Sequence, residues 1–211
     1  MTFLANHRER NVIRLQLKQN SALAGLTEDD LRELESQLVI TDSSKAEFLQ
    51  QQGVREMQQY FIVDGILKRV VSNPEGKEMI LRFACETDME TSYAAWRLGT
   101  PTPYGIVGVT KTRVASLPMK DWGTFLDARS AHKQSFEYDV MKVMSDVMAH
   151  TITLHLLDAP GRVQRFMRKH PDLVDRIPQK ELASYLNLSA ETLSRLRHSG
   201  KINPPSTAGS N

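Results

Sequence analysis

The spacing of apolar residues changes along the chain, and each change predicts a different kind of element. Leu31, Leu34 and Leu38 recur at helical spacing behind a threonine and three acidic residues, as in a capped helix. From about residue 45 to 118 the apolar runs are short and separated by turn sequences, which predicts β-strands. Residues 130–157 contain neither Pro nor Gly and predict one long helix.

Turn sequences divide the β region. Asp64-Gly65 lies between two apolar runs, and an Asp-Gly pair in that position predicts a β-hairpin. A second turn is predicted at residues 73–76, in the sequence Asn-Pro-Glu-Gly. The apolar runs cover residues 58–63, 66–71, 104–109 and 113–117, the last two predicted to form a further pair. Several short strands of this kind predict a small antiparallel barrel or roll.

The long helix carries two apolar stripes. The first steps by four and three residues through Phe136, Val140, Val143, Val147, His150, Leu154 and Leu157. This heptad spacing predicts a seam that packs on the same helix of a second copy. The second stripe, Met141, Met144, Met148 and Ile152, lies on an adjacent face. A helix buried wholly within one chain is the alternative.

Residues 179–197 predict a helix–turn–helix that follows a hinge at residues 158–161. The first helix presents Leu182 and Leu186 on one face, and small Ala183 allows a second helix to cross closely. Asn187 tolerates the positive φ that the turn needs, and Ser189 is a good N-cap. The inward residues of the second helix are Leu193 and Leu196.

The second helix carries the candidate DNA contacts. Arg195 can pair with guanine, Glu191 can accept from cytosine, and Ser194 can serve several bases. Lys180, Thr192 and Arg197 are candidate phosphate contacts, which position a helix without reading sequence. Glu191 and Arg195 could instead form an i,i+4 ion pair on a solvated helix.

The charge distribution fits a nucleic-acid-binding end on a different body. The net charge is only +2, but residues 161–211 hold nine basic and four acidic residues, which leaves residues 1–160 with a charge of −3. No apolar run is long enough to span a membrane and the N-terminus has no signal-like segment, so we expect a cytoplasmic protein. Cys85 is the single cysteine, predicted to be a buried apolar residue, with redox sensing as the alternative.

The order of roll, long helix, hinge and helix–turn–helix resembles the Crp/Fnr superfamily of bacterial transcription regulators over roughly residues 20–200. Specific similarities are residues 75–81 (Glu-Gly-Lys-Glu-Met-Ile-Leu), residues 157–162 (Leu-Asp-Ala-Pro-Gly-Arg) and the Fnr-like Glu-x-x-Ser-Arg of residues 191–195. The resemblance implies an α+β fold with a roll like a cyclic-nucleotide-binding domain. It also implies a homodimer that binds palindromic DNA with TTGA-like half-sites and contacts RNA polymerase.

The ligand residues of the family are not retained. At the positions of its Gly-Glu and Arg-Ser/Thr pairs this chain has Thr91-Ser92 and Thr102-Pro103. Without that arginine, and with a proline that removes a backbone donor, binding of cAMP is not expected. Arg97 is the nearest substitute cation. One cysteine also cannot hold the iron–sulfur cluster of the oxygen-sensing branch.

An unusually aromatic corner is the candidate effector pocket. Its predicted residues are Ser92, Tyr93, Trp96, Arg97, Thr102 and Tyr104. An apolar effector or haem could bind there, and a filled corner that needs no ligand is equally compatible with the sequence. Conceivable haem ligands are His132, His150 and His155, although partly exposed helix residues are the simpler interpretation. No protein metal site is predicted.

The expected organisation is an arm at 1–19, a roll at 20–129, a dimerisation helix at 130–157 and a DNA-binding domain at 158–211. Turn-forming residues from about 203 predict a disordered tail in place of the β-hairpin wing of the family. A signalling module whose degenerate helix–turn–helix no longer binds DNA is the main alternative. The chain has no P-loop, dinucleotide fingerprint or nucleophile elbow, so an enzyme is not expected. The effector, the target genes and the choice between activation and repression stay open.

Overall fold

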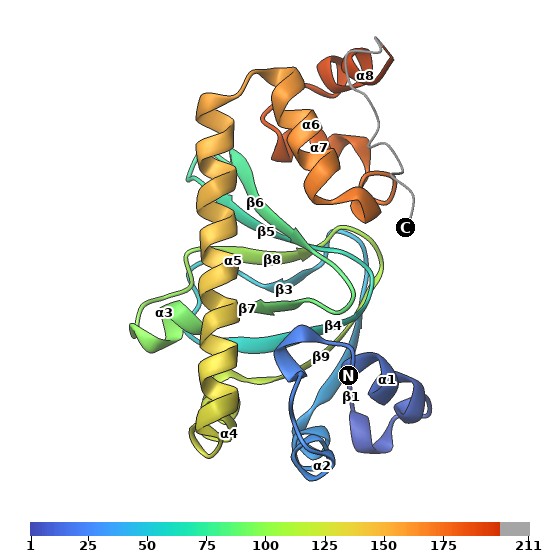
Figure 1. Cartoon of the computed structure of the whole chain (residues 1–211), viewed down its shortest axis with the longest axis vertical. Helices are drawn as coiled ribbons and strands as arrows, with labels where there is room; N and C mark the ends of the chain where they lie inside the picture. The colour runs from blue at the N-terminus through green and yellow to red at the C-terminus, as the bar shows by residue number, and fades with distance from the viewer. Residues whose placement is uncertain (199–211) are drawn as a thin grey trace, which may run out of the picture.

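A computed structural model describes residues 1–198 and has the predicted α+β fold. A β-roll forms the centre, one long helix runs along its side, and a small helical domain sits at one end (Figure 1). The predicted tail from residue 203 and the missing wing lie outside the described residues.

The roll consists of two antiparallel sheets. The first has the order β1-β2-β9-β4-β7, with bounds Thr2–Phe3, Val39–Ser43, Thr112–Pro118, Gln58–Asp64 and Met89–Thr91. The second has the order β3-β8-β5-β6, with bounds Phe48–Gln50, Gly105–Gly108, Leu67–Ser72 and Glu78–Ala84. The inner faces of the sheets hold much of the core, so the predicted roll is confirmed.

The hairpin predicted at Asp64-Gly65 is wrong. The turn joins β4 to β5, which belong to different sheets and do not pair with each other. Gly65 has φ 93°, and a Cβ added there would lie 2.4 Å from the carbonyl oxygen of Lys111. The glycine therefore lets the chain pass tightly from one sheet to the other, which the local Asp-Gly signal does not distinguish from a hairpin.

The strand pair predicted at 104–109 and 113–117 is also wrong, for the same reason. β8 pairs with β3 and β5, whereas β9 pairs with β2 and β4. By contrast, the turn at residues 73–76 does join two paired strands, β5 and β6, and this prediction is confirmed. Which strands pair is decided by contacts distant in sequence, so strand positions were easier to predict than strand partners.

The N-terminal residues pack on the roll as ordered structure. A short helix, η1 (Leu4–Asn6), leads to α1 (Arg10–Leu17), whose Ile13 and Leu17 are buried in the main core. The segment predicted as an N-terminal arm is therefore largely helical. After η2 (Ser21–Leu23), α2 (Glu28–Gln37) begins at Thr27 with a capping box that includes Asp30, as its sequence predicts.

Three helices follow along one side of the roll: α3 (Tyr93–Arg97), α4 (Met119–Asp127) and α5 (Ser130–Leu156). An aromatic cluster joins them to β4. The rings of Phe61 and Phe136 each meet Trp122 edge-on, at centroid distances of 5.3 and 5.2 Å. The ring of Tyr93 also meets that of Phe136 edge-on, at a centroid distance of 5.1 Å. This cluster fixes which face of α5 turns toward the roll.

The predicted dimer seam on α5 is therefore wrong in its N-terminal half. Phe136 and Val140 are 1 % and 7 % exposed and belong to the core of their own chain. Val143, Val147, His150 and Leu154 are partly buried on the inward side, and Leu157 lies just beyond the helix end. The adjacent stripe of Met141, Met144, Met148 and Ile152 also recurs at helical steps of three and four residues, so spacing alone did not identify the inward stripe.

The C-terminal domain comprises α6 (Ala159–Lys169), η3 (Pro171–Leu173), α7 (Gln179–Tyr185) and α8 (Ala190–His198). At the predicted hinge the chain leaves α5, and Asp158 caps α6, with Pro160 in the first turn. The domain shares a hydrophobic cluster with the roll, in which Phe83 meets Tyr185 at a centroid distance of 5.0 Å. Ion pairs Lys68–Glu181 at 2.8 Å and Arg176–Glu86 at 2.6 Å flank this contact.

Candidate functional site

The helix–turn–helix has the local structure that its sequence predicts. Leu182, Leu186 and Leu193 are buried between the two helices. Asn187 has φ 52°, the left-handed conformation expected for the turn. The hydroxyl of Ser189 accepts a hydrogen bond from the backbone N–H of Thr192 and so caps α8.

The turn has a further support that the sequence analysis missed. Arg162 on α6 donates to the carbonyl oxygens of Leu186 and Asn187 at 2.8 and 3.3 Å. These carbonyls end α7, so the guanidinium satisfies groups that the helix leaves open. A basic residue four positions beyond the cap Asp158 was the only signal for it in the sequence.

The structure brings together the candidate base contacts on α8. Glu191 and Arg195 are exposed and Ser194 is half-buried, on the side opposite the buried Leu193 and Leu196. Within residues 1–198 Glu191 and Arg195 do not form the alternative i,i+4 ion pair. Their polar groups are therefore free to meet a ligand.

The candidate phosphate contacts surround this face. Lys180 at the start of α7 and Arg197 near the end of α8 are both exposed. Arg197 also donates to the carbonyl oxygen of Val174 at 3.2 Å. Thr192 is half-buried, and its hydroxyl accepts a hydrogen bond from that of Ser189, so it is the least accessible of the three.

A second exposed surface lies on α5. Met141, Met144, Met148 and Ile152 are 51–65 % exposed and form the stripe adjacent to the inward one. Isolated exposed apolar residues are ordinary, but a continuous methionine-rich stripe along one helix usually marks a contact surface. This stripe replaces the predicted seam as the candidate surface for a second copy.

The predicted effector corner is largely filled by its own side chains. Ser92 and Thr102 are buried, with their hydroxyl oxygens 3.1 Å apart, and Gln50 donates to Ser92 at 2.8 Å. Tyr93 and Trp96 contact each other, and the Tyr93 hydroxyl donates to Glu137. The partners of Arg97 are this hydroxyl and the Glu137 carboxylate, which lies 3.6 Å away.

A cavity of about 540 Å³ lies beside this corner, between the roll and α5. Of the six predicted effector residues only Tyr104 lines it. Most of its wall is apolar, from the segment after α3 and from Val140, Val143, Met144 and Val147 of α5. The cavity thus lies next to the predicted corner, but most of the residues that line it were not predicted. Those of α5 are distant in sequence from the corner.

One buried cation, Arg69, also lines this cavity, and the sequence analysis missed it. Its guanidinium donates to the fully buried Glu90 at 2.6 and 3.0 Å and lies over the Tyr104 ring at 4.1 Å. Proximity to Glu90 raises the pKa of Arg69 even though burial opposes it. The sequence did contain a signal for this buried pair: Arg69 lies within an apolar strand, and the oppositely charged Glu90 lies in a later strand, β7. An anionic ligand here would have to compete with Glu90.

The candidate haem ligands do not converge. His132 lies against Trp122, and His150 stacks on Tyr185 with its Nε2 3.0 Å from the carbonyl oxygen of that residue. His155 is exposed near the end of α5. No group of three or more His, Cys, Asp or Glu within residues 1–198 is arranged to hold a metal ion.

Burial raises the pKa of the Cys85 thiol to about 11, which disfavours the reactive thiolate.

Comparison with known proteins relates the fold to one group. No family model and no curated protein matches the sequence. FixK2 from Bradyrhizobium japonicum superposes with a TM-score of 0.66 at 16 % identity, covering 77 % of this chain and 84 % of its own. A protein from Eubacterium rectale assigned to the Crp/Fnr family of transcriptional regulators superposes with a TM-score of 0.65 at 15 % identity, covering 83 % and 84 %. The chain has the Crp/Fnr fold.

Catabolite activator protein of Thermus thermophilus shares this fold over 86 % of both chains, with a TM-score of 0.54 and 16 % identity. The resemblance read from the sequence is thus confirmed for the Crp/Fnr fold, including the order of roll, long helix and helix–turn–helix. Within residues 1–198 no helix combines the length and the apolar character that a membrane crossing requires.

Proposed function

We propose that this chain is a transcription regulator that binds specific DNA sequences as a homodimer. The observation that carries the proposal is α8, whose Glu191 and Arg195 are exposed and unpaired with each other while Leu193 and Leu196 anchor its other side. A helix so held can enter the major groove without unfolding its support. Arg195 would then donate two bonds to guanine, and Glu191 would accept from cytosine.

The exposed stripe of α5 supplies the dimer contact in this proposal. Pairing of Met141, Met144, Met148 and Ile152 with the same residues of a second copy buries them and duplicates α8 about a two-fold axis. Such a dimer binds two half-sites separated by one helical turn, about 34 Å. The Glu-x-x-Ser-Arg sequence of α8 favours palindromic DNA with TTGA-like half-sites. We also propose contact with RNA polymerase, which the resemblance to the Crp/Fnr regulators implies.

The effector of this regulator is proposed to be something other than cAMP. In the predicted effector corner the hydroxyl groups of Ser92 and Thr102 hydrogen-bond to each other. In the apolar cavity beside it the guanidinium of Arg69 is already bonded to Glu90, so among the described residues that line this cavity no unpaired cation can meet a phosphate. The largely apolar wall favours an apolar effector. Haem is not favoured, because His132, His150 and His155 lie outside the residues that line the cavity.

The experiment is selection of binding sites from a random DNA pool, followed by mobility shifts with the enriched sequence. Arg195→Ala is expected to cost about 1–3 kcal/mol in binding and to relax preference at one position of each half-site. Arg8→Ala, at an exposed arginine just before α1, is the matched control and should leave binding unchanged, because α1 and α8 lie at opposite ends of the molecule (Figure 1). A pool that yields no enriched palindrome would favour the alternative of a signalling module that does not bind DNA.

A further inference from the structure

The exposed stripe of α5 consists largely of methionine. Three of its four members are Met141, Met144 and Met148, and Ile152 is the fourth. Steps of three and four residues place the three thioethers on one face of the helix, within about 10 Å along its axis. Paired helices ordinarily meet through leucine, isoleucine or valine, whose side chains hold no reactive atom. The sulfur atoms therefore give this surface a chemistry that an aliphatic seam lacks.

Exposure sets these methionines apart from those of the core. In the single chain Met141, Met144 and Met148 are 59 %, 52 % and 65 % exposed. Outside α5, Met79 of β6 is 46 % exposed and offers an internal reference. Three of the nine methionines are at most 5 % exposed, namely Met57, Met89 and Met119. A dissolved reagent can therefore reach the stripe in a single chain, but not the methionines of the core.

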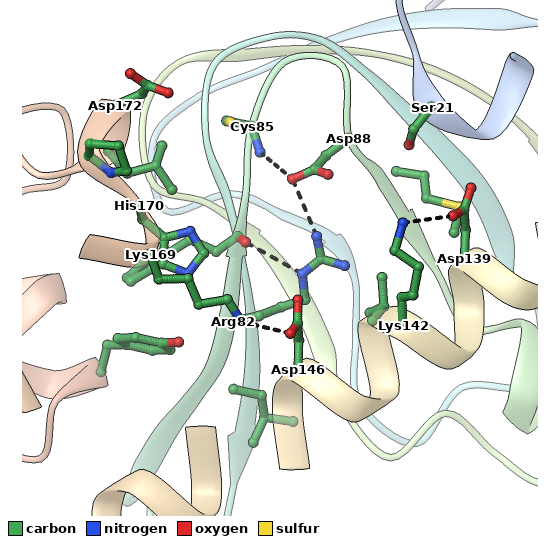
Figure 2. Close-up of a pocket in the computed structure, with 17 residues that line it drawn as sticks. Ser21, Arg82, Cys85, Asp88, Asp139, Lys142, Asp146, Lys169, His170 and Asp172 are labelled. Carbon is green, nitrogen blue, oxygen red and sulfur yellow. Dashed lines mark hydrogen bonds and ion pairs between the residues drawn. The ribbon is translucent and has the colours of Figure 1, made fainter. Parts of the chain in front are cut away.

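The single thiol of the chain is a poorer target for oxidants. Cys85 is half-buried in the turn after β6, and its backbone N–H donates to the Asp88 carboxylate at 3.4 Å (Figure 2). Burial, and then the negative charges of Asp88 and Glu86, raise the pKa of this thiol to about 11. Oxidants attack the thiolate, which is scarce near neutral pH at such a pKa. A thioether needs no deprotonation, so the methionine sulfur atoms stay reactive.

We propose that Met141, Met144 and Met148 form a modification site for oxidants of the hypohalous acid class, and that their oxidation dissociates the homodimer. The thioether sulfur attacks the chlorine of hypochlorous acid, the O–Cl bond breaks and hydroxide leaves. Hydroxide then displaces chloride from the sulfur, so that an S–O bond forms and a proton is released. The sulfur loses two electrons and the chlorine gains them, which yields methionine sulfoxide, chloride and a proton.

The sulfoxide changes the dimer contact without changing the fold. Its S–O group accepts hydrogen bonds from water in the single chain, whereas pairing of two stripes would bury it in an apolar contact. The three methionines lie outside the hydrophobic clusters formed by the described residues, so the oxidised chain stays folded. The proposal rests on the homodimer of the proposed function, but not on DNA binding.

Access to the sulfur atoms depends on the assembly itself. Pairing of two stripes covers the thioethers, so the oxidant reaches them in chains that have dissociated. An oxidised chain no longer pairs, and mass action then draws further dimers apart. Oxidation of the stripe should therefore slow as the protein concentration rises, whereas oxidation of Met79, on the exposed surface of β6, should not.

The first test is peptide mass spectrometry of the full chain treated with hypochlorous acid. Samples are prepared below and above the Kd of the dimer, which analytical ultracentrifugation gives. The ratio of sulfoxide in the stripe to sulfoxide at Met79 should be at least fivefold lower in the concentrated sample. Met79 corrects for oxidant that the protein consumes elsewhere. A ratio that does not change with concentration, or a stripe that stays unoxidised, overturns the proposal.

Ultracentrifugation of the treated chain measures the dissociation. Once the stripe is oxidised, the Kd of the dimer should rise at least tenfold, and treatment with both methionine sulfoxide reductases should return it to within twofold of its first value. Thermal unfolding and circular dichroism should show that the oxidised chain is folded. A dimer that survives with all three sulfoxides in place contradicts this proposal and leaves the proposed function intact.

Variants locate the sensitive group. The triple variant Met141→Leu, Met144→Leu and Met148→Leu keeps an apolar stripe without thioethers, so treatment should change its own dimer Kd less than twofold. Cys85→Ala and Met79→Leu are the matched controls, and treatment should weaken their dimers as much as that of the unmodified protein. Equal loss of the dimer in the triple variant places the sensitive group elsewhere and overturns the proposal.

Mobility shifts connect this modification with DNA. The Kd of the unmodified protein for the enriched sequence should rise at least tenfold on treatment, and that of the triple variant should change less than twofold. If the chain binds no DNA, the DNA-binding part of the proposed function fails, while ultracentrifugation still decides whether oxidation dissociates the dimer. An untreated protein that sediments as a monomer at every concentration overturns both the homodimer and this proposal.

Discussion

The imidazole of His150 on α5 stacks face to face on the ring of Tyr185 on α7. Their centroids are 3.7 Å apart and their planes differ by 2°. The Nε2 of His150 also lies 3.0 Å from the carbonyl oxygen of Tyr185. Tyr185 in turn meets Phe83 of the roll, so one tyrosine connects the long helix, the helix–turn–helix and the roll. Because α8 packs on α7, this contact helps to hold the helix–turn–helix against α5 and the roll.

The first prediction concerns acid stability. Burial lowers the pKa of His150 to about 4, and it does the same to the nearby His170. Both are neutral when folded, whereas in the unfolded chain they take up protons near pH 6.5. The unfolded state therefore binds more protons between these values, and the free energy of unfolding should fall as pH drops from about 6.5 toward 4.

Urea unfolding at pH 7.5 and pH 5 measures this effect. His150→Phe keeps a ring against Tyr185 but does not titrate, so its loss of stability between the two pH values should be smaller than that of the unmodified protein. His155→Phe, at an exposed position on the same helix, should leave the pH dependence unchanged. The same slope in all three proteins would exclude His150 as a source.

The second prediction distinguishes the two stripes of α5. Met144→Glu places a charge in the exposed stripe and should shift the dimer to monomer, because pairing would bury that charge. Met79→Glu, at an exposed methionine of β6, is the control and should stay dimeric. Analytical ultracentrifugation gives the subunit number. A monomeric unmodified protein, or a dimeric Met144→Glu, contradicts the assignment.

Phe136 provides the reciprocal test. Its ring contacts Trp122 and Tyr93 within the chain, so Phe136→Ala should cost about 3–5 kcal/mol of folding stability. Sedimentation of the folded variant should still show a dimer. Loss of the dimer without loss of stability would restore the seam that the heptad spacing predicted.

The third prediction concerns Gly65. In Gly65→Ala the new Cβ would lie 2.4 Å from the carbonyl oxygen of Lys111, so backbone must shift and stability should fall by more than about 1 kcal/mol. Gly53 also has a positive φ, but a Cβ there has no atom within 4 Å, so Gly53→Ala should show only the conformational cost. Thermal unfolding compares the two. Equal losses would show that the close approach to Lys111 is unimportant.

The sequence by itself determined the features that depend on neighbours along the chain. The caps at Thr27 and Asp158, the positive φ of Asn187 and the extent of α5 follow from hydrogen bonds and side-chain spacings within a few residues. The exposed Glu191 and Arg195 were predictable for the same reason, because a helix fixes which of its residues share a face.

Only the tertiary structure decided which surfaces meet. The partners of β4 and β5, the inward face of α5 and the Arg69–Glu90 pair all depend on residues distant in sequence. Two apolar stripes on one helix, or an Asp-Gly turn between two apolar runs, fit more than one arrangement locally. These arrangements differ in how much apolar area they bury and in which buried polar groups they pair. Both quantities depend on the packing of the whole chain.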